Sequence, residues 1–338
     1  MTFALAAVEP RLPSARGPLS QAVCELLSQR VSRHHLERVE VPLTDADPLG
    51  LDLQLALYIC YELHYRGFSG VHPRWEWDAG LLHLRGRMED VFLAAVHQLV
   101  DGREDASADD EMAVLSVEPA RGEGPSYFLR DNGTWEQMQE YFVHRSLYHL
   151  KEGDPHAFVI PRLQGQAKAS FVAIEFDEYG AGRGQRLHQQ LFADLMDSAG
   201  LDSTYLGYLD AVPAQTLAVV NLMSLFGLHR ELRGAAVGHF AATEITSPPG
   251  SRRMAQALRR LGAGAPCVAF YEEHVEADAV HEQVVRAGVV GDLVAREPAL
   301  EPDVVFGMRA FGALEDRLAD HLTGCWREGE TSLARPLS

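Results

Sequence analysis

The sequence has no long hydrophobic run and comparatively few basic residues. Among its 338 residues, 48 acidic side chains stand against 30 basic ones, which gives a formal net charge of −18. This charge disfavours binding to a nucleic-acid backbone or to an anionic membrane surface. No apolar stretch approaches the roughly 18 residues of a transmembrane helix, and the first residues lack the basic and apolar segments of a signal peptide. We therefore expect a soluble, cytoplasmic protein that binds neither nucleic acid nor membrane.

Cysteine is also scarce, which bears on zinc and disulfide chemistry. The four cysteines, Cys24, Cys60, Cys267 and Cys325, lie far apart and form no CxxC pair. This spacing disfavours a zinc or thiol-exchange motif, so we expect reduced thiols that mostly fill the core. Hydrophobic residues make up 46% of the chain, enough for a sizeable core and too many for a disordered acidic polymer.

Apolar residues recur at steps of three and four along most of the chain, and no two-residue hairpin turn separates alternating segments. The pattern predicts an all-α protein. We expect N-terminal helices over Ser20–Val31, Leu49–Tyr65 and Arg87–Val100. The charged, turn-rich stretch Asp101–Ser126 is interpreted as a surface linker with one short extended piece around Met112–Val117.

The second part of the chain carries stronger helix signals, beginning with a capping box formed by Thr134 and Gln137. The expected helices cover residues 134–151, 156–178, 187–198, 213–226, 229–246, 251–261, 266–287 and 302–325. The predicted organisation is an N-terminal helical extension with an acidic linker, residues 1–125, followed by a helical bundle, residues 126–330.

The sharpest local motif is His274-Val-Glu-Ala-Asp278-Ala-Val-His281. At 100° per residue, the three named side chains fall within about 60° of one another on a helix. Two imidazoles and one carboxylate on one face suit iron, manganese or zinc. The alternative interpretation is a surface helix that happens to carry histidines.

Glu244 lies on an apolar helix stripe, because Val237, Phe240 and Glu244 follow at steps of three and four. A buried carboxylate without a partner would be costly or would stay protonated. Its position therefore calls for an arginine or a cation, and a simple ion pair is the alternative to a metal.

Two further segments place acids beside histidines. Glu152 ends a helical run just before Pro155, and His149 and His156 flank it, so a purely local cluster is the competing interpretation. In the second segment Glu175, Asp177 and Glu178 precede His188. Glycines at 180, 182 and 184 interrupt the helical pattern, so helical phase cannot choose among these three carboxylates.

Together these segments gather several glutamates, one aspartate and three histidines into a helical bundle. Two divalent cations neutralise about four carboxylates, which suits a pair of irons. A single zinc needs only three or four ligands. The surplus of carboxylates therefore favours two metal ions.

The segments LKEGDPHAFVIPRLQGQAKA, EFDEYGAGRGQRLHQQLF and HVEADAVH, with the lone Glu244, resemble the haem-oxygenase-like di-iron oxidases and oxygenases, or iron-containing redox enzymes, over about Thr134–Ala287. The resemblance implies a haem oxygenase helical fold that holds two Fe(II)/Fe(III) ions and no haem. Glu152 would bridge the irons and, with Glu178, would be catalytic. The implied ligand sets are His188, His281 and Glu178 for one iron, and Glu244, His274 and Asp278 for the other.

The same resemblance implies that O2 is the co-substrate and is reduced to a peroxo-bridged diferric state by an external electron donor. The Glu178 carboxylate favours N-oxygenation of an amino acid or a similar small-molecule amine. Oxidative C–C cleavage or desaturation is the alternative within the family. Outside it, a metal-free helical binding module and a haem protein remain as hypotheses, although haem would have no use for the clustered acids. The sequence leaves the substrate-binding residues and the oligomeric state, including a homodimer, open.

Overall fold

The computed structural model describes residues 9–29, 41–100, 106–118 and 122–337, without the side chains of residues 276–279. Over these residues the regular elements are all helical and no strand is present, which confirms the predicted all-α class. No helix in this part of the chain is long and apolar enough to span a membrane. All four cysteines are free, with Cys60 and Cys267 buried as expected.

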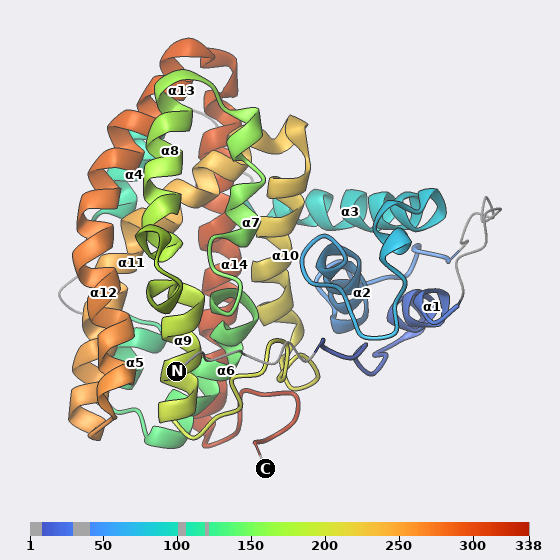
Figure 1. Ribbon diagram of the computed structural model, residues 1–338, viewed down its shortest axis with the longest axis horizontal. Coiled ribbons are helices and arrows are strands. Elements are labelled where there is room, and N and C mark those ends of the chain that lie inside the picture. The colour runs from blue at the N-terminus through green and yellow to red at the C-terminus, as the bar shows by residue number, and fades with distance from the viewer. Residues whose placement is uncertain (1–8, 30–40, 101–105, 119–121, 338) are drawn as a thin grey trace.

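The three N-terminal helices lie beside the larger bundle, next to α10 (Figure 1). They are α1 (Pro18–Leu27), α2 (Leu51–Glu62) and α3 (Ala79–Val100). Helix α2 is apolar on nearly all sides and is buried between α1 and α10, as expected for a helix without a solvent face. These elements confirm the predicted N-terminal helices, although α3 begins eight residues earlier than Arg87. Residues 30 and 31 of the first predicted helix lie outside the described residues.

The expected linker is partly helical, so the predicted extended piece at Met112–Val117 is wrong. Helix α4 (Ala108–Leu115) begins with a capping box between Ser107 and Asp110, and α5 (Pro125–Asp131) follows. The acidic run fills the first turn of α4, where negative charge is favourable beside the helix N-terminus. Helix α4 packs against α11 and α14, so tertiary contacts stabilise a helix too short for a periodic signal. The boundary at residue 125 stays a prediction.

The bundle contains the remaining long helices and several short ones. They are α6 (Trp135–His149), α7 (Asp154–Ala157), α8 (Gly165–Glu178), α9 (His188–Ser198), α10 (Ala214–Leu228), α11 (Arg233–Leu261), α12 (Ala265–Gln283), α13 (Asp292–Arg296) and α14 (Glu301–Glu328). Short 3₁₀ helices join them at η2 (Ile160–Arg162), η3 (Gly180–Gly182), η4 (Gly184–Arg186), η5 (Arg230–Leu232) and η7 (Pro298–Leu300), and a π-helical segment, η6 (Val284–Gly291), follows α12. Another 3₁₀ helix, η1 (Pro73–Trp77), lies between α2 and α3.

Two predicted boundaries are wrong. The expected helix over 156–178 is divided into α7, η2 and α8, because Pro161 and Gly165 interrupt it. Conversely, the two helices expected over 229–246 and 251–261 form one helix, α11, that continues through Pro248 and Pro249. Proline lacks the amide hydrogen that a helix interior uses. Packing of α11 against both α12 and α14 keeps the helix continuous at this point.

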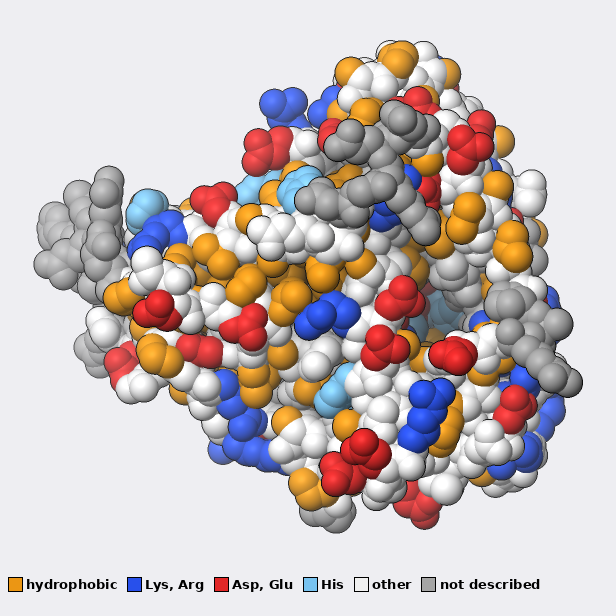
Figure 2. Space-filling model, turned by 180° about the vertical axis from the view of Figure 1, so that it is seen from behind, with side chains coloured by type: hydrophobic (Ala, Val, Ile, Leu, Met, Phe, Trp, Pro, Cys, Tyr) orange, Lys and Arg blue, Asp and Glu red, His pale blue; other side chains and the backbone are white. Residues whose placement is uncertain are grey.

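Local ion pairs balance part of the acidic excess. Arg145 and Glu315 form a close pair at 2.7 Å, and Arg309 pairs with Glu111. On the face seen in Figure 2, acidic and basic side chains lie intermingled. The negative charge is therefore dispersed on this face.

Helices α11 and α14 cross at very short distance around Gly238. A Cβ atom at Gly238 would collide with the backbone carbonyl of Val304 on α14. Backbone atoms cannot move aside as a flexible side chain can, so only glycine permits this crossing. The crossing holds α11, and with it Glu244, at a fixed distance from its neighbours.

We expect Gly238→Ala to lower the free energy of unfolding by about 1–3 kcal/mol, because it overpacks the crossing. Chemical or thermal unfolding measures this loss. Gly312→Ala is the matched control on α14, since a Cβ there meets nothing within 4 Å. This control should be neutral or stabilising by up to about 1 kcal/mol, as alanine favours helix over glycine. Equal stability of the two variants would contradict the packing account.

Candidate metal centre

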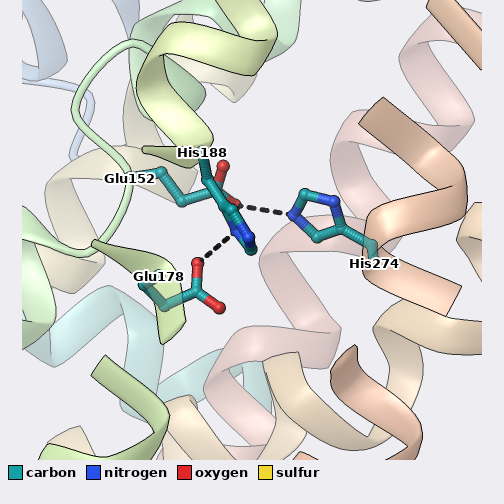
Figure 3. A group of neighbouring side chains, drawn as sticks. All are labelled: Glu152, Glu178, His188 and His274. Carbon is teal, nitrogen blue, oxygen red and sulfur yellow. Dashed lines mark ion pairs between the residues drawn. The ribbon is translucent and has the colours of Figure 1, made fainter. Parts of the chain in front are cut away.

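Six of the seven predicted ligand side chains meet inside the bundle. They are buried and come from the turn after α6 and from α8, α9, α11 and α12: Glu152, Glu178, His188, Glu244, His274 and His281. Figure 3 shows four of them pointing toward one another. The seventh, Asp278, belongs to α12, but its side chain lies outside the described residues and its role stays a prediction.

Local chain geometry brings the first three residues together. Glu152 stands in the turn between α6 and α7, where Gly153 takes a φ of 85°, a conformation that favours glycine. Glu178 ends α8 and His188 begins α9. The glycine-rich connection leaves α8 and α9 running in the same direction along α12, with Asp177 beside His281 and Leu195 beside Cys267. Across this connection Glu178 Oε2 lies 2.8 Å from His188 Nδ1.

Helices α11 and α12 supply the other three residues from the opposite side. His274 and His281 are seven residues apart on α12, which places them two turns apart on one face. His274 Nε2 lies 3.5 Å from Glu152 Oε1 (Figure 3). Glu244 of α11 is buried, as its apolar stripe predicts, and its Oε2 lies 3.2 Å from His281 Nδ1.

The ligand atoms form two groups that share one carboxylate. Glu152, Glu178, His188 and His274 make up the first group, and Glu178, Glu244 and His281 the second, with the ligand atoms of each group within 4.8 Å of one another. Glu178 turns Oε2 to His188, and its Oε1 lies 4.0 Å from His281 Nδ1. Its two oxygens therefore face different groups.

This grouping differs from the one that the resemblance implies. His188 lies with His274, at 4.5 Å between ring centroids, and not in the group of His281. Glu178, and not Glu152, is the carboxylate common to both groups. The reason is the packing of α9 against α12, which brings the start of α9 to the level of His274.

The three acids before His188 occupy distinct positions. Glu178 faces the ligand groups, whereas the Asp177 side chain is 53% exposed and its Oδ2 lies 3.1 Å from His281 Nε2. Glu175 is buried, and neither of its oxygens has a hydrogen-bond partner among the described residues. Burial raises the pKa of Glu175 well above its usual range, and the charges of Glu178 and Glu244 raise it further.

Histidines provide the nearby positive charge. Burial raises the pKa of Glu152, but His149 and His274 lower it by more, so that it lies well below its ordinary value. For His188 the two effects have the opposite signs: burial lowers its pKa, and Glu178 raises it by more. The pKa of His188 therefore lies above its ordinary value. Over the described ranges, no lysine or arginine forms an ion pair with Glu152, Glu175 or Glu178.

Hydrogen bonds orient two of the imidazoles. His274 Nδ1 donates to the carbonyl of Phe270 at 2.8 Å, which leaves Nε2 as the nitrogen with a lone pair toward Glu152. His281 has a carboxylate at each nitrogen, with Nε2 3.1 Å from Asp177 Oδ2 and Nδ1 3.2 Å from Glu244 Oε2. A cation at Nδ1 would leave the ring proton on Nε2, where it is donated to Asp177. A carboxylate or carbonyl behind a histidine fixes its tautomer and increases its basicity as a metal ligand.

His149 is a neighbour of the centre that the sequence analysis placed in the competing local cluster and not among the ligands. Its Nδ1 lies 2.9 Å from Glu152 Oε1, and the three-residue spacing between them was the available signal. The other flanking histidine turns away from Glu152: His156 Nε2 lies 3.4 Å from His239 Nδ1. The local cluster thus includes His149, and His156 belongs to a separate buried pair.

The donor set fits cations. It combines buried carboxylate oxygens with imidazole nitrogens, a mixture that suits iron. Glu152 Oε2 also lacks a hydrogen-bond partner within the described residues, and an unsatisfied buried carboxylate oxygen is costly. Cations among these side chains would remove that cost and the repulsion between the glutamates.

Comparison with known proteins agrees with this geometry. A family model described as iron-containing redox enzyme matches residues 139–316, a stretch of more than half of the chain that includes every ligand candidate. The chain is also similar to the nitrosourea synthase of Streptomyces achromogenes subsp. streptozoticus, with 26% identity over 166 residues, 49% of this chain and 35% of that protein. The chain thus matches about a third of the length of that relative.

The chain belongs to the iron-containing redox enzyme family, and its all-α architecture is the haem-oxygenase-like fold of that family. The description of that family is iron-containing redox enzyme. The buried glutamates and histidines form a centre compatible with iron.

We expect Asp177→Ala to weaken metal binding by about 10–100-fold, the usual effect of removing a residue that orients a metal-binding histidine. Anaerobic titration with Fe(II) measures the affinity. Asp194→Asn is the control, because it also removes one negative charge but lies on α9 with Gln190 as its partner. If Asp177→Ala bound Fe(II) as tightly as the control does, Asp177 would have no orienting role.

Proposed function

We propose that this chain is a non-haem di-iron, O2-dependent oxygenase that N-oxygenates the amine of an amino acid or a similar small metabolite. The observation that carries the proposal is the pair of ligand groups with Glu178 in common. A carboxylate with one oxygen toward each of two nitrogen-and-oxygen donor groups is suited to join two ions.

Charge supports two ions over one. Glu152, Glu178 and Glu244 are all buried, and Asp278 is a fourth acid by sequence prediction. Two divalent ions neutralise about four carboxylates, as in other di-iron carboxylate bundles. One divalent ion would leave buried negative charge without compensation.

The residues of this chain act mainly by binding and orienting. Glu178 holds the two ligand groups together, Phe270 and Asp177 keep His274 and His281 in one tautomer each, and His149 holds Glu152. Two irons bound by these groups would supply the electrons that reduce O2 and the oxidising power for oxygen transfer to the substrate. Burial of all six ligands limits the access of bulk water to this chemistry.

The choice of N-oxygenation rests on two observations. Glu178 adds a carboxylate to the ligand set, and the relative named nitrosourea synthase is named for a product in which nitrogen is bonded to oxygen. An amine nitrogen offers a lone pair to an electrophilic oxygen, so an amine is the substrate class we favour. Because this chain matches only part of that relative, we do not propose that it makes the same product.

Incubation with Fe(II), O2, a reductant and a panel of amino acids and related amines tests this proposal. We expect a product that has gained oxygen at nitrogen and takes up label from ¹⁸O2, as measured by mass spectrometry. His281→Ala should give no such product, because it removes a ligand of the second group. The matched control, His321→Ala, removes a histidine of α14 that bonds the carbonyl of Ser332 away from the centre, and should keep the activity.

The same measurement separates the alternatives. A product that has lost carbon or two hydrogens would replace N-oxygenation by oxidative cleavage or desaturation. A chain that binds amines but neither Fe(II) nor O2 would be a metal-free binding module, and the proposed enzyme function would be wrong.

A further inference from the structure

A fully buried ion pair lies directly beside the ligand turn and connects it to the N-terminal helices. Lys151 precedes Glu152 and is 1% exposed, and its Nζ lies 3.1 Å from Oε2 of Glu62, which is 0% exposed. Glu62 is the last residue of α2. The rings of Tyr58 and Tyr65 lie 4.5 Å and 4.3 Å from the same ammonium group. A residue next to a ligand is therefore anchored by α2.

Such a pair is an expensive way to stabilise a fold. Removing two charges from water costs several kcal/mol per ion, and well-packed apolar residues of the same volume are often no less stabilising. The Glu62 carboxylate has a second hydrogen-bond donor, because the Tyr205 hydroxyl lies 2.9 Å and 2.8 Å from its two oxygens. The pair fixes the direction of Lys151, which an apolar contact would leave less defined.

Arg66, one turn after Glu62, makes a second connection to the centre. Its Nη2 donates to the carbonyl of Leu150 at 3.0 Å and to Oε1 of Gln189 at 2.9 Å. Gln189 follows the ligand His188, and its Nε2 donates to the carbonyl of Glu152 at 3.0 Å and to Oδ1 of Asp154 at 3.1 Å. Arg66 and Gln189 thus tie the turn that carries Glu152 to the helix start that carries His188.

We infer that Glu62 and Arg66 are positioning residues for the metal centre, which hold Glu152 and His188 at the spacing that the first ligand group requires. This inference rests on the proposed di-iron function. Both residues lie outside the stretch 139–316 that the family model matches. The N-terminal helices would then be part of the metal-binding unit of this chain.

A separate contact between the same two parts of the chain provides a matched control. Arg85 of α3 pairs with Glu89 at 3.1 Å, and Glu89 pairs with His229 after α10, also at 3.1 Å. This contact joins the N-terminal helices to the bundle through buried charges, but it touches no segment that carries a ligand. His229→Ala removes the part of this contact that crosses to the bundle and leaves the ligand turn untouched. Arg85 is not the residue to replace, because its Nη1 also lies 2.6 Å from Nε2 of His64, between Glu62 and Arg66.

Anaerobic Fe(II) titration of the full-length chain tests the inference, with circular dichroism to check the fold. We expect Arg66→Ala to weaken binding of one iron equivalent by about tenfold or more, in the range seen for residues behind metal ligands. The double variant Glu62→Gln with Lys151→Met removes both buried charges together, so no charge is left unpaired and folding should be retained. It should show the same loss, whereas His229→Ala should bind like the wild type.

Two results would overturn the inference while leaving the proposed function intact. In the first, Arg66→Ala and the double variant bind two irons with wild-type affinity. In the second, His229→Ala is weakened as much as Arg66→Ala, which would show a general docking effect. A wild-type chain that binds no iron would instead overturn the proposed function, and this inference with it.

Discussion

Mutual repulsion between buried carboxylates is the constraint on which the centre depends. Glu152, Glu178 and Glu244 are buried close together, and Glu175 lies near them with both oxygens unsatisfied among the described residues. Among the described residues, Glu152 and Glu178 form ion pairs with histidines and with no lysine or arginine. Such a group is stable only if protons or cations compensate it. Membership in an iron-containing family makes iron the cation that we propose for this centre.

The fold supplies these residues from rigid elements. Helix α11 packs closely on both α12 and α14, which fixes Glu244 relative to the histidines of α12. The turn after α6 and the start of α9 carry the remaining ligands, and turns are less rigid than helix interiors. The contacts of Lys151 and Gln189 with the end of α2 stiffen these two segments.

Helical periodicity was enough to predict the residues that lie within long helices. Glu244 on an apolar stripe and His274 with His281 on one face are properties of a single helix, and their burial follows from sequence spacing. The choice among Glu175, Asp177 and Glu178 did not follow, because the glycine-rich connection between α8 and α9 breaks the helical phase. The division of ligands into two groups depends on how α9 packs against α12, which no local pattern contains. Helix α4 was not predicted, because its eight residues are too few for a periodic signal and tertiary packing stabilises it.

The most direct test of this account is the number of irons bound by the wild type and by Glu178→Ala, measured by anaerobic Fe(II) titration with elemental analysis. The shared carboxylate predicts two irons per chain in the wild type and loss of tight binding at both positions in Glu178→Ala. A wild type that saturates with one iron, or a Glu178→Ala variant that still binds two tightly, would contradict it.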